Sequence, residues 1–145
     1  MELREYQQKA MDRIRLYLEK LSKQHESGNI KHGSSDAWEE MFGSVGYVKR
    51  SNGLGRDFPN FCLKIPTGGG KTLLAVKTID TINTVFRKKK TGFVLWIVPT
   101  TQIYRQTLQA LTQRDHPYRQ HLDIASGGRT VIREKLERFT PLDVQ

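Results

Sequence analysis

The sequence predicts an α/β fold in which a parallel sheet is flanked by helices. Two apolar runs, residues 61–65 and 93–98, are short and nearly continuous, as is typical of strands buried on both faces. Each run is followed by a loop and then by a segment with helical periodicity. Strands that alternate with helices in this way are typical of βαβ units, and therefore of a parallel sheet.

Length and composition indicate a single domain. The chain has 145 residues, of which 37% are apolar and 27% are charged, a balance too apolar for a disordered tail. Its longest apolar run, 93–98, is far shorter than the roughly 20 residues of a membrane span. The N-terminus lacks the apolar core of a signal peptide. We therefore expect a soluble cytoplasmic protein with no membrane partner.

The charge balance favours an anionic partner without requiring one. Lysine and arginine number 24 against 15 aspartates and glutamates, which gives a formal net charge of +9. A solvated lysine-rich face would explain the same surplus. The single cysteine, Cys62, excludes an intrachain disulfide framework and a multi-cysteine zinc site.

Periodicity predicts the helices in chain order. Residues 3–22 form an amphipathic pattern, with apolar side chains three and four positions apart. Residues 28–57 hold six of the twelve glycines and predict an inserted loop with one helical turn at 36–42, capped by Ser35 or Asp36. Further helices are predicted at 71–87 and 101–113, and the cations that close the first of these complement the negative end of its dipole.

The last third carries weaker patterns. Residues 122–125 predict a short strand, 126–128 a turn, and 130–139 a helix. Pro141 would end that helix, because proline lacks the backbone N–H and clashes with the preceding turn.

A glycine-rich segment between a predicted strand and a predicted helix indicates phosphate binding. Three consecutive glycines let backbone N–H groups wrap around a phosphate, and the following helix adds its N-terminal donors. Lys71 brings a positive charge to the β- and γ-phosphates, and the Thr72 hydroxyl can ligate Mg²⁺. Ile65 stands where the strict P-loop pattern has a glycine. The predicted nucleotide-binding residues of the segment are Thr67, Gly68, Gly69, Gly70, Lys71 and Thr72.

This Pro-Thr-Gly-x-Gly-Lys-Thr form resembles the phosphate loop of superfamily 2 helicases and translocases. Leu-Arg-Glu-Tyr-Gln at 3–7 and Val-Pro-Thr-Thr-Gln-Ile-Tyr-Arg-Gln at 98–106 resemble the opening segment and motif Ia of the same superfamily. The sequences of these segments are most similar to the Res subunit of type III restriction enzymes. The similar segments occur in the same order and span most of residues 1–128. The resemblance implies an incomplete RecA-like P-loop NTPase lobe, the N-terminal part of one helicase ATP-binding domain: a motif Q helix at 1–27, an insertion at 28–57 and a P-loop and motif Ia core at 58–145.

The resemblance also implies ATP and Mg²⁺ as cofactors and double-stranded DNA as a partner of an ATP-dependent translocase or helicase. A methyltransferase (modification) subunit is a further partner in that family. By resemblance, Gln7 hydrogen-bonds the adenine, since an amide donates and accepts at once. The residues that the resemblance assigns to the nucleic-acid backbone are Thr100, Thr101, Gln106, Gly127 and Gly128.

One part of the family pattern is missing. The family holds Mg²⁺ and orients the attacking water with an Asp-Glu pair at the end of a later apolar strand. No acidic pair after Val98 ends an apolar run, so no catalytic residue is predicted and we expect the catalytic half beyond residue 145. Two alternatives remain: a truncated remnant that only binds nucleotide or DNA, and a P-loop small-molecule kinase, against which the segments 3–7 and 98–106 argue.

Overall fold

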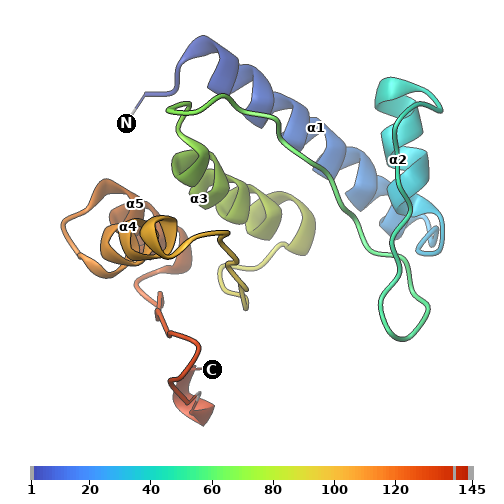
Figure 1. Cartoon of the computed structure of the whole chain (residues 1–145). Helices are drawn as coiled ribbons and strands as arrows, with labels where there is room; N and C mark the ends of the chain where they lie inside the picture. The colour runs from blue at the N-terminus through green and yellow to red at the C-terminus, as the bar shows by residue number, and fades with distance from the viewer. Residues whose placement is uncertain (1, 139, 144–145) are drawn as a thin grey trace.

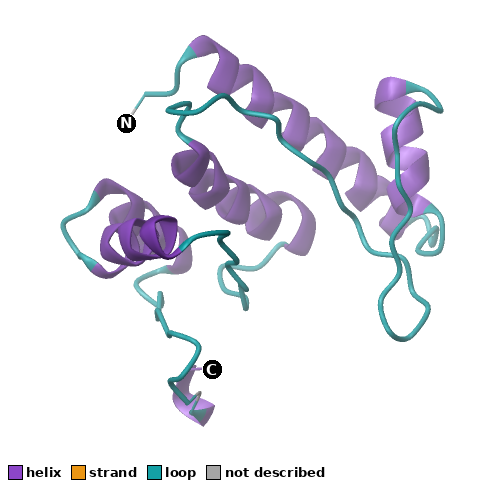
Figure 2. Ribbon diagram, viewed as in Figure 1, coloured by secondary structure: helices purple, strands orange, loops and turns teal. Residues whose placement is uncertain are grey.

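The computed structural model describes residues 2–138 and 140–143, and its regular elements are helices (Figures 1 and 2). Within the described residues, extended pairing is limited to the isolated bridge between Ser51 and Asp57. In chain order the elements are α1 (Glu5–Glu26), α2 (Gly33–Phe42), α3 (Lys71–Thr81), the π-helix η1 (Ile82–Arg87), α4 (Thr101–Thr112), α5 (Pro117–Ser126) and the 3₁₀ turn η2 (Pro141–Asp143).

The predicted parallel sheet flanked by helices, and with it the RecA-like α/β class, is therefore wrong for the described residues. Residues 61–65 and 93–98 lie outside every helix and pair with no strand in this part of the chain. A parallel strand satisfies its backbone groups only through neighbouring strands, and these are distant in sequence. A short apolar run alone does not determine whether such neighbours assemble.

The two apolar runs have different surroundings. Phe61 and Ile65 pack against the helical core, and the Phe61 ring meets Tyr17 edge-on at a centroid distance of 6.0 Å. In residues 93–98, by contrast, Leu95 is 73% exposed and Ile97 is 81% exposed. Residues 61–65 therefore form an extended segment that is partly buried against the helices, whereas residues 93–98 expose apolar side chains to solvent.

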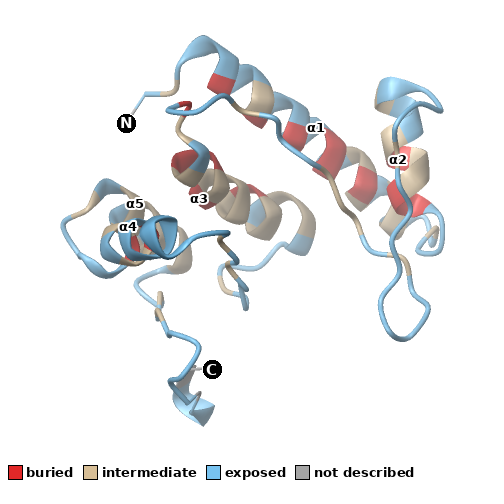
Figure 3. Ribbon diagram, in the orientation of Figure 1, coloured by how far each residue is buried: buried red, intermediate tan, exposed pale blue. Residues whose placement is uncertain are grey.

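The core lies between α1, α2 and the start of α3 (Figure 3). The Tyr17 hydroxyl donates to the Ser34 carbonyl at 3.2 Å, and its ring packs edge-on against Trp38 of α2. Apolar side chains spaced three and four apart on α1 form most of this core, as its amphipathic pattern predicts. The buried members are Met11, Ile14, Tyr17, Leu18, Leu21, Ala37 and Leu74.

Three predicted helices are confirmed. The pattern at 3–22 corresponds to α1, the one at 71–87 to α3 with η1, and the one at 101–113 to α4. The predicted turn at 36–42 lies in a longer helix, α2, whose N-cap is His32 rather than Ser35 or Asp36.

The last third differs most from its prediction. Residues 122–125 are helical, because α5 begins with Pro117 at its first position, where the fixed φ of proline favours a helix. The predicted helix at 130–139 is wrong for its described residues, because 130–138 are not helical, and this stretch opens with three β-branched side chains, which lower helix propensity. Position 139, the predicted end of that helix, lies outside the described residues.

Helix α5 joins α4 to the rest of the molecule. Nε2 of His121 lies 3.1 Å from a carboxylate oxygen of Asp80 on α3. Arg119 pairs with Asp123 at 3.0 Å and donates to the carbonyls of Leu111 and Thr130, at 3.1 and 2.8 Å. None of the described helices has the length and apolar character needed to cross a membrane.

Candidate nucleotide-binding loop

The segment predicted to bind phosphate, residues 66–72 and called the phosphate loop below, is a tight turn followed by the first two residues of α3. The Gly69 N–H donates to the Pro66 carbonyl at 2.9 Å, which closes a turn whose third residue, Gly68, has φ +75°. Gly70 has φ +78° and is the N-cap of α3, and its carbonyl accepts the Leu74 N–H at 3.0 Å. The predicted loop between an apolar segment and a helix is present, although the apolar segment is not a strand.

Positive φ restricts Gly68 and Gly70 to glycine, and close contacts restrict Gly69 and Gly70. Gly68 has open space around it but a φ that side-chain-bearing residues rarely adopt. A Cβ on Gly69 would lie 2.5 Å from Cγ2 of Ile65 and 2.7 Å from the Pro66 carbonyl oxygen. A Cβ on Gly70 would lie 2.5 Å from Nε2 of Gln7. The loop is therefore restricted by its own turn and also by contact with α1.

Two side chains of α1 hold the loop through one carbonyl group. The Tyr6 hydroxyl donates to the Gly69 carbonyl at 3.0 Å, and Nε2 of Gln7 donates to the same oxygen at 2.9 Å. Oε1 of Gln7 accepts the Arg4 N–H at 2.9 Å, so both ends of the amide are engaged. Figure 1 shows how this arises: the segment between α2 and α3 runs back beside α1 and brings the loop to the start of that helix.

Gln7, predicted to contact adenine, is thus buried against the loop, and only 5% of it is exposed. Any contact with a base has to use the second hydrogen of Nε2 or the second lone pair of Oε1. Tyr6 was not predicted as a site residue. A tyrosine beside Gln7 gives no sequence signal for this contact, because its partner lies 63 positions away.

Lys71 and Thr72 occupy the first turn of α3. Lys71 is exposed and forms no ion pair with a described carboxylate, and Thr72 is half-buried. The first N–H groups of a helix have no intrahelical acceptor, and they form the positive end of its dipole. An exposed cation, free helix donors and a glycine turn together fit a phosphate group.

The predicted nucleic-acid residues of α4 lie on the surface, Thr100 and Thr101 at its start and Gln106 in its second turn. The Thr100 hydroxyl is already in use, because it caps the helix by accepting the Ile103 N–H at 3.3 Å. Thr101 and Gln106 are exposed, with Arg105 exposed between them. Replacement of Thr100 would therefore disturb the helix as well as any contact with a ligand.

Gly127 and Gly128 end α5 with φ values of +66° and +80°. The Gly128 N–H donates to the Asp123 carbonyl at 2.7 Å and the Gly127 N–H to the Ile124 carbonyl at 3.3 Å, the pattern of a glycine C-cap. Both glycines are exposed, but their amides are occupied by the helix end. In the described part of the chain, no hydrogen bond or ion pair joins Thr100, Thr101, Gln106 or this doublet to the phosphate loop.

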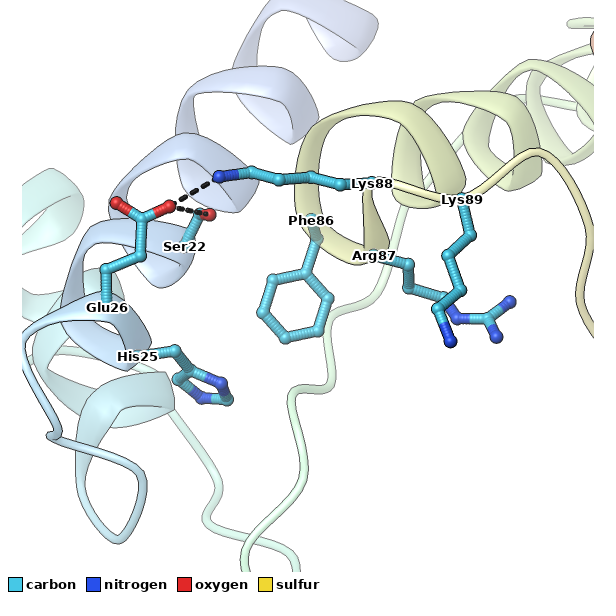
Figure 4. Close-up of a pocket in the computed structure, with 7 residues that line it drawn as sticks. All are labelled: Ser22, His25, Glu26, Phe86, Arg87, Lys88 and Lys89. Carbon is cyan, nitrogen blue, oxygen red and sulfur yellow. Dashed lines mark hydrogen bonds and ion pairs between the residues drawn. The ribbon is translucent and has the colours of Figure 1, made fainter.

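A surface hollow of about 460 Å³ lies at the opposite end of the α1–α3 pair, between Ser22 and Lys89 (Figure 4). Lys88, with φ +51° at the end of η1, pairs with Glu26 at 2.5 Å and lowers the pKa of that carboxyl below its usual value. The cations at 87–90 therefore contribute at least one link between helices, in addition to the predicted dipole complement. No group of three or more metal-ligating side chains occurs among the described residues.

Comparison with known proteins identifies the family. No curated protein and no solved structure matches the chain. The family model described as type III restriction enzyme, res subunit, matches residues 1–139. This family is helicase-like, of restriction type, ATP-dependent and DNA-related. Because the match covers nearly the whole chain, the protein belongs to the type III restriction enzyme res subunit family.

Proposed function

We propose that this chain binds Mg-ATP on the phosphate loop and duplex DNA beside α4, as the nucleotide- and DNA-binding part of an ATP-dependent translocase or helicase. The observation that carries the proposal is the exposed Lys71 in the first turn of α3, behind a glycine turn fastened to α1. The proposal places the protein in the cytoplasm, where its DNA substrate would be.

The triphosphate would lie against the start of α3. Lys71 supplies a compact positive charge, and the free N–H groups of the first helical turn supply donors. The Thr72 hydroxyl is the group of this loop that would hold Mg²⁺ together with the phosphate oxygens. In this proposal Gln7 hydrogen-bonds the adenine with the Nε2 hydrogen and the Oε1 lone pair that are not used by Gly69 and Arg4.

DNA would contact the exposed start of α4 through phosphate groups. The positive end of the helix dipole favours an anion there, and the exposed Arg105 in the next turn adds a charge. Thr101 and Gln106 are the side chains there that remain free to donate, and the glycine doublet at 127–128 is the weaker candidate because its amides serve the helix end.

Hydrolysis by this chain alone is expected to be slow. No described carboxylate is hydrogen-bonded to the phosphate loop, and the described residues hold no acidic cluster that would fix a second side of a magnesium ion. We therefore expect this chain to bind ATP with little hydrolysis. The alternative of a remnant that only binds nucleotide or DNA leads to the same expectation. A methyltransferase partner remains a proposal from the family alone.

The test compares Lys71→Ala with Lys64→Ala, which removes an exposed charge shortly before the loop. Calorimetry with Mg-ATP should detect binding to the wild type and to Lys64→Ala. We expect Lys71→Ala to weaken binding by about 100-fold or more, because the cation contacts two phosphates. Equal affinities for the two variants would contradict the proposed site, and DNA-stimulated turnover by the wild type would contradict the expectation of slow hydrolysis.

For DNA, Gln106→Ala and Arg105→Ala are compared with Arg114→Ala in the turn after α4. Anisotropy with a labelled duplex should show weaker binding for the first two and a salt dependence that becomes shallower for Arg105→Ala, because fewer counterions are released. Unchanged affinity in both variants would exclude the start of α4 as the contact surface.

A further inference from the structure

We propose that Tyr6 is a positioning residue which, together with Gln7, sets the orientation of the Gly69–Gly70 peptide for phosphate binding. This inference rests on the proposed nucleotide site and adds to it a role for a residue of α1. The two hydrogen bonds to the Gly69 carbonyl are called the Gly69 tether below.

The tether determines where the next backbone donor points. A carbonyl oxygen accepts two hydrogen bonds, and Tyr6 and Gln7 provide two donors to Gly69, at 3.0 and 2.9 Å. The described chain contains no cis peptide, and in a trans peptide the N–H points opposite to the C=O. With the Gly69 carbonyl held toward α1, the Gly70 N–H therefore points away from α1.

Without the tether this peptide would reorient easily. Glycine residues occupy positive and negative φ with similar ease, so a peptide between two of them has a low preference for one orientation. The opposite orientation would aim a carbonyl oxygen where the Gly70 N–H now points, and the oxygen would repel a phosphate. The hydroxyl of Tyr6 and the amide of Gln7 therefore favour the orientation that binds an anion.

The surroundings of the tether are built for this arrangement. Gln7 is 5% exposed and its Oε1 is fixed by the Arg4 N–H, so the amide cannot rotate without losing both bonds. A Cβ on Gly70 would collide with the Gln7 amide, so the glycine leaves room for the tether as well as for its own backbone. Tyr6 is 37% exposed, so loss of its hydroxyl should not unfold the chain.

The experiment measures affinities for three magnesium-loaded probes: ATP, GTP and linear tripolyphosphate, which has no base. The variants are Tyr6→Phe and Gln7→Leu, and the matched control is Tyr17→Phe, which removes another α1 hydroxyl that donates to a backbone carbonyl, far from the loop. Thermal midpoints are measured in parallel.

Tyr6→Phe should weaken the affinity for all three probes by the same factor, about 2- to 10-fold, which is the effect of one lost hydrogen bond. Gln7→Leu should weaken the affinity for tripolyphosphate at least as much. Tyr17→Phe should leave that affinity unchanged. A common factor for probes with and without a base indicates an effect on the loop rather than on base recognition. A merely structural role would lower the thermal midpoint and leave the affinity of the folded protein as it was.

Unchanged tripolyphosphate binding in Tyr6→Phe and Gln7→Leu would overturn the inference, as would a loss confined to ATP in Gln7→Leu, which would assign that amide to the base alone. In both cases the proposed nucleotide site would still be supported by the separate test of Lys71. A wild-type chain that binds none of the three probes would overturn the proposed site and this inference together.

Discussion

The phosphate loop and the α4–α5 hairpin carry the two halves of the proposed site, and they are held in different ways. The loop is fixed by contacts between residues more than 60 positions apart, from α1 to Gly69. Within the hairpin, α4 and α5 are joined by contacts within 20 positions, most of them made by Arg119, and the hairpin is linked to α3 through His121 and Asp80. Burial follows the same division, since α1 contributes six buried residues, Gln7, Met11, Ile14, Tyr17, Leu18 and Leu21, and α4 only Thr107 and Leu111.

This difference indicates which half determines the stability of the molecule. Packing in the α1–α2–α3 core stabilises the nucleotide half, because burial of apolar surface is the largest favourable contribution to folding. The hairpin depends on polar links to its neighbours and has few buried side chains of its own. Its proposed contacts with DNA are therefore on the part of the molecule that opens more easily.

Leu21→Ala should have the largest effect on this comparison. Leu21 is fully buried, and removal of such a side chain leaves a cavity, at a cost of about 2–5 kcal/mol in the free energy of unfolding. Leu16→Ala, on the exposed side of the same helix, is the control. Denaturant unfolding measures both, and similar losses would mean that α1 does not bury the face described above.

Arg119→Ala should have the next largest effect, and a local one. The side chain is 12% exposed and bonds Asp123, Leu111 and Thr130, so its loss is expected to cost about 2 kcal/mol. Hydrogen exchange should speed up over residues 111–130 and stay unchanged in α1. Uniform acceleration along the whole chain would show that the hairpin and the core unfold as one unit.

Alkaline pH should weaken the core through Tyr17. Burial, followed by the nearby Tyr47, raises the pKa of the Tyr17 hydroxyl above its ordinary value. The folded state therefore keeps a proton that the unfolded state releases, so this contribution is complete below about pH 10 and is lost as the pH rises from there toward the folded pKa. The slope is at most about 1.4 kcal/mol per pH unit.

Unfolding of the wild type and of Tyr17→Phe between pH 8 and pH 11, roughly the range around the ordinary tyrosine pKa, measures this contribution. The variant should show a shallower loss of stability. Parallel curves for the two proteins would contradict the shielding of Tyr17 by the core.

Ile97→Ser should have the smallest effect. Ile97 is 81% exposed, so the change should alter the free energy of unfolding by no more than about 0.5 kcal/mol. Val76→Ser, at a fully buried position of α3, is the contrast and should be severe. A large loss for Ile97→Ser would show that the run 93–98 is covered in solution, as the predicted strand required.

The local features of the site were predictable. The periodicities at 3–22, 71–87 and 101–113 correspond to helices, and the residues that surround Lys71 form the expected glycine turn before a helix. The family follows from the same segments. The contact of Tyr6 was not predictable, and neither was the commitment of the Gln7 amide to Gly69, because both depend on where the chain returns beside α1.

The sequence by itself determined the helices at 3–22, 71–87 and 101–113, the glycine turn before Lys71 and the family, since each depends on residues that are close together along the chain. The tertiary structure decided whether the apolar runs at 61–65 and 93–98 are buried or exposed, and the conformation in which the loop is held. The physical reason is that a helix satisfies its backbone within four residues, whereas a strand or a tethered carbonyl needs a partner from a distant part of the chain.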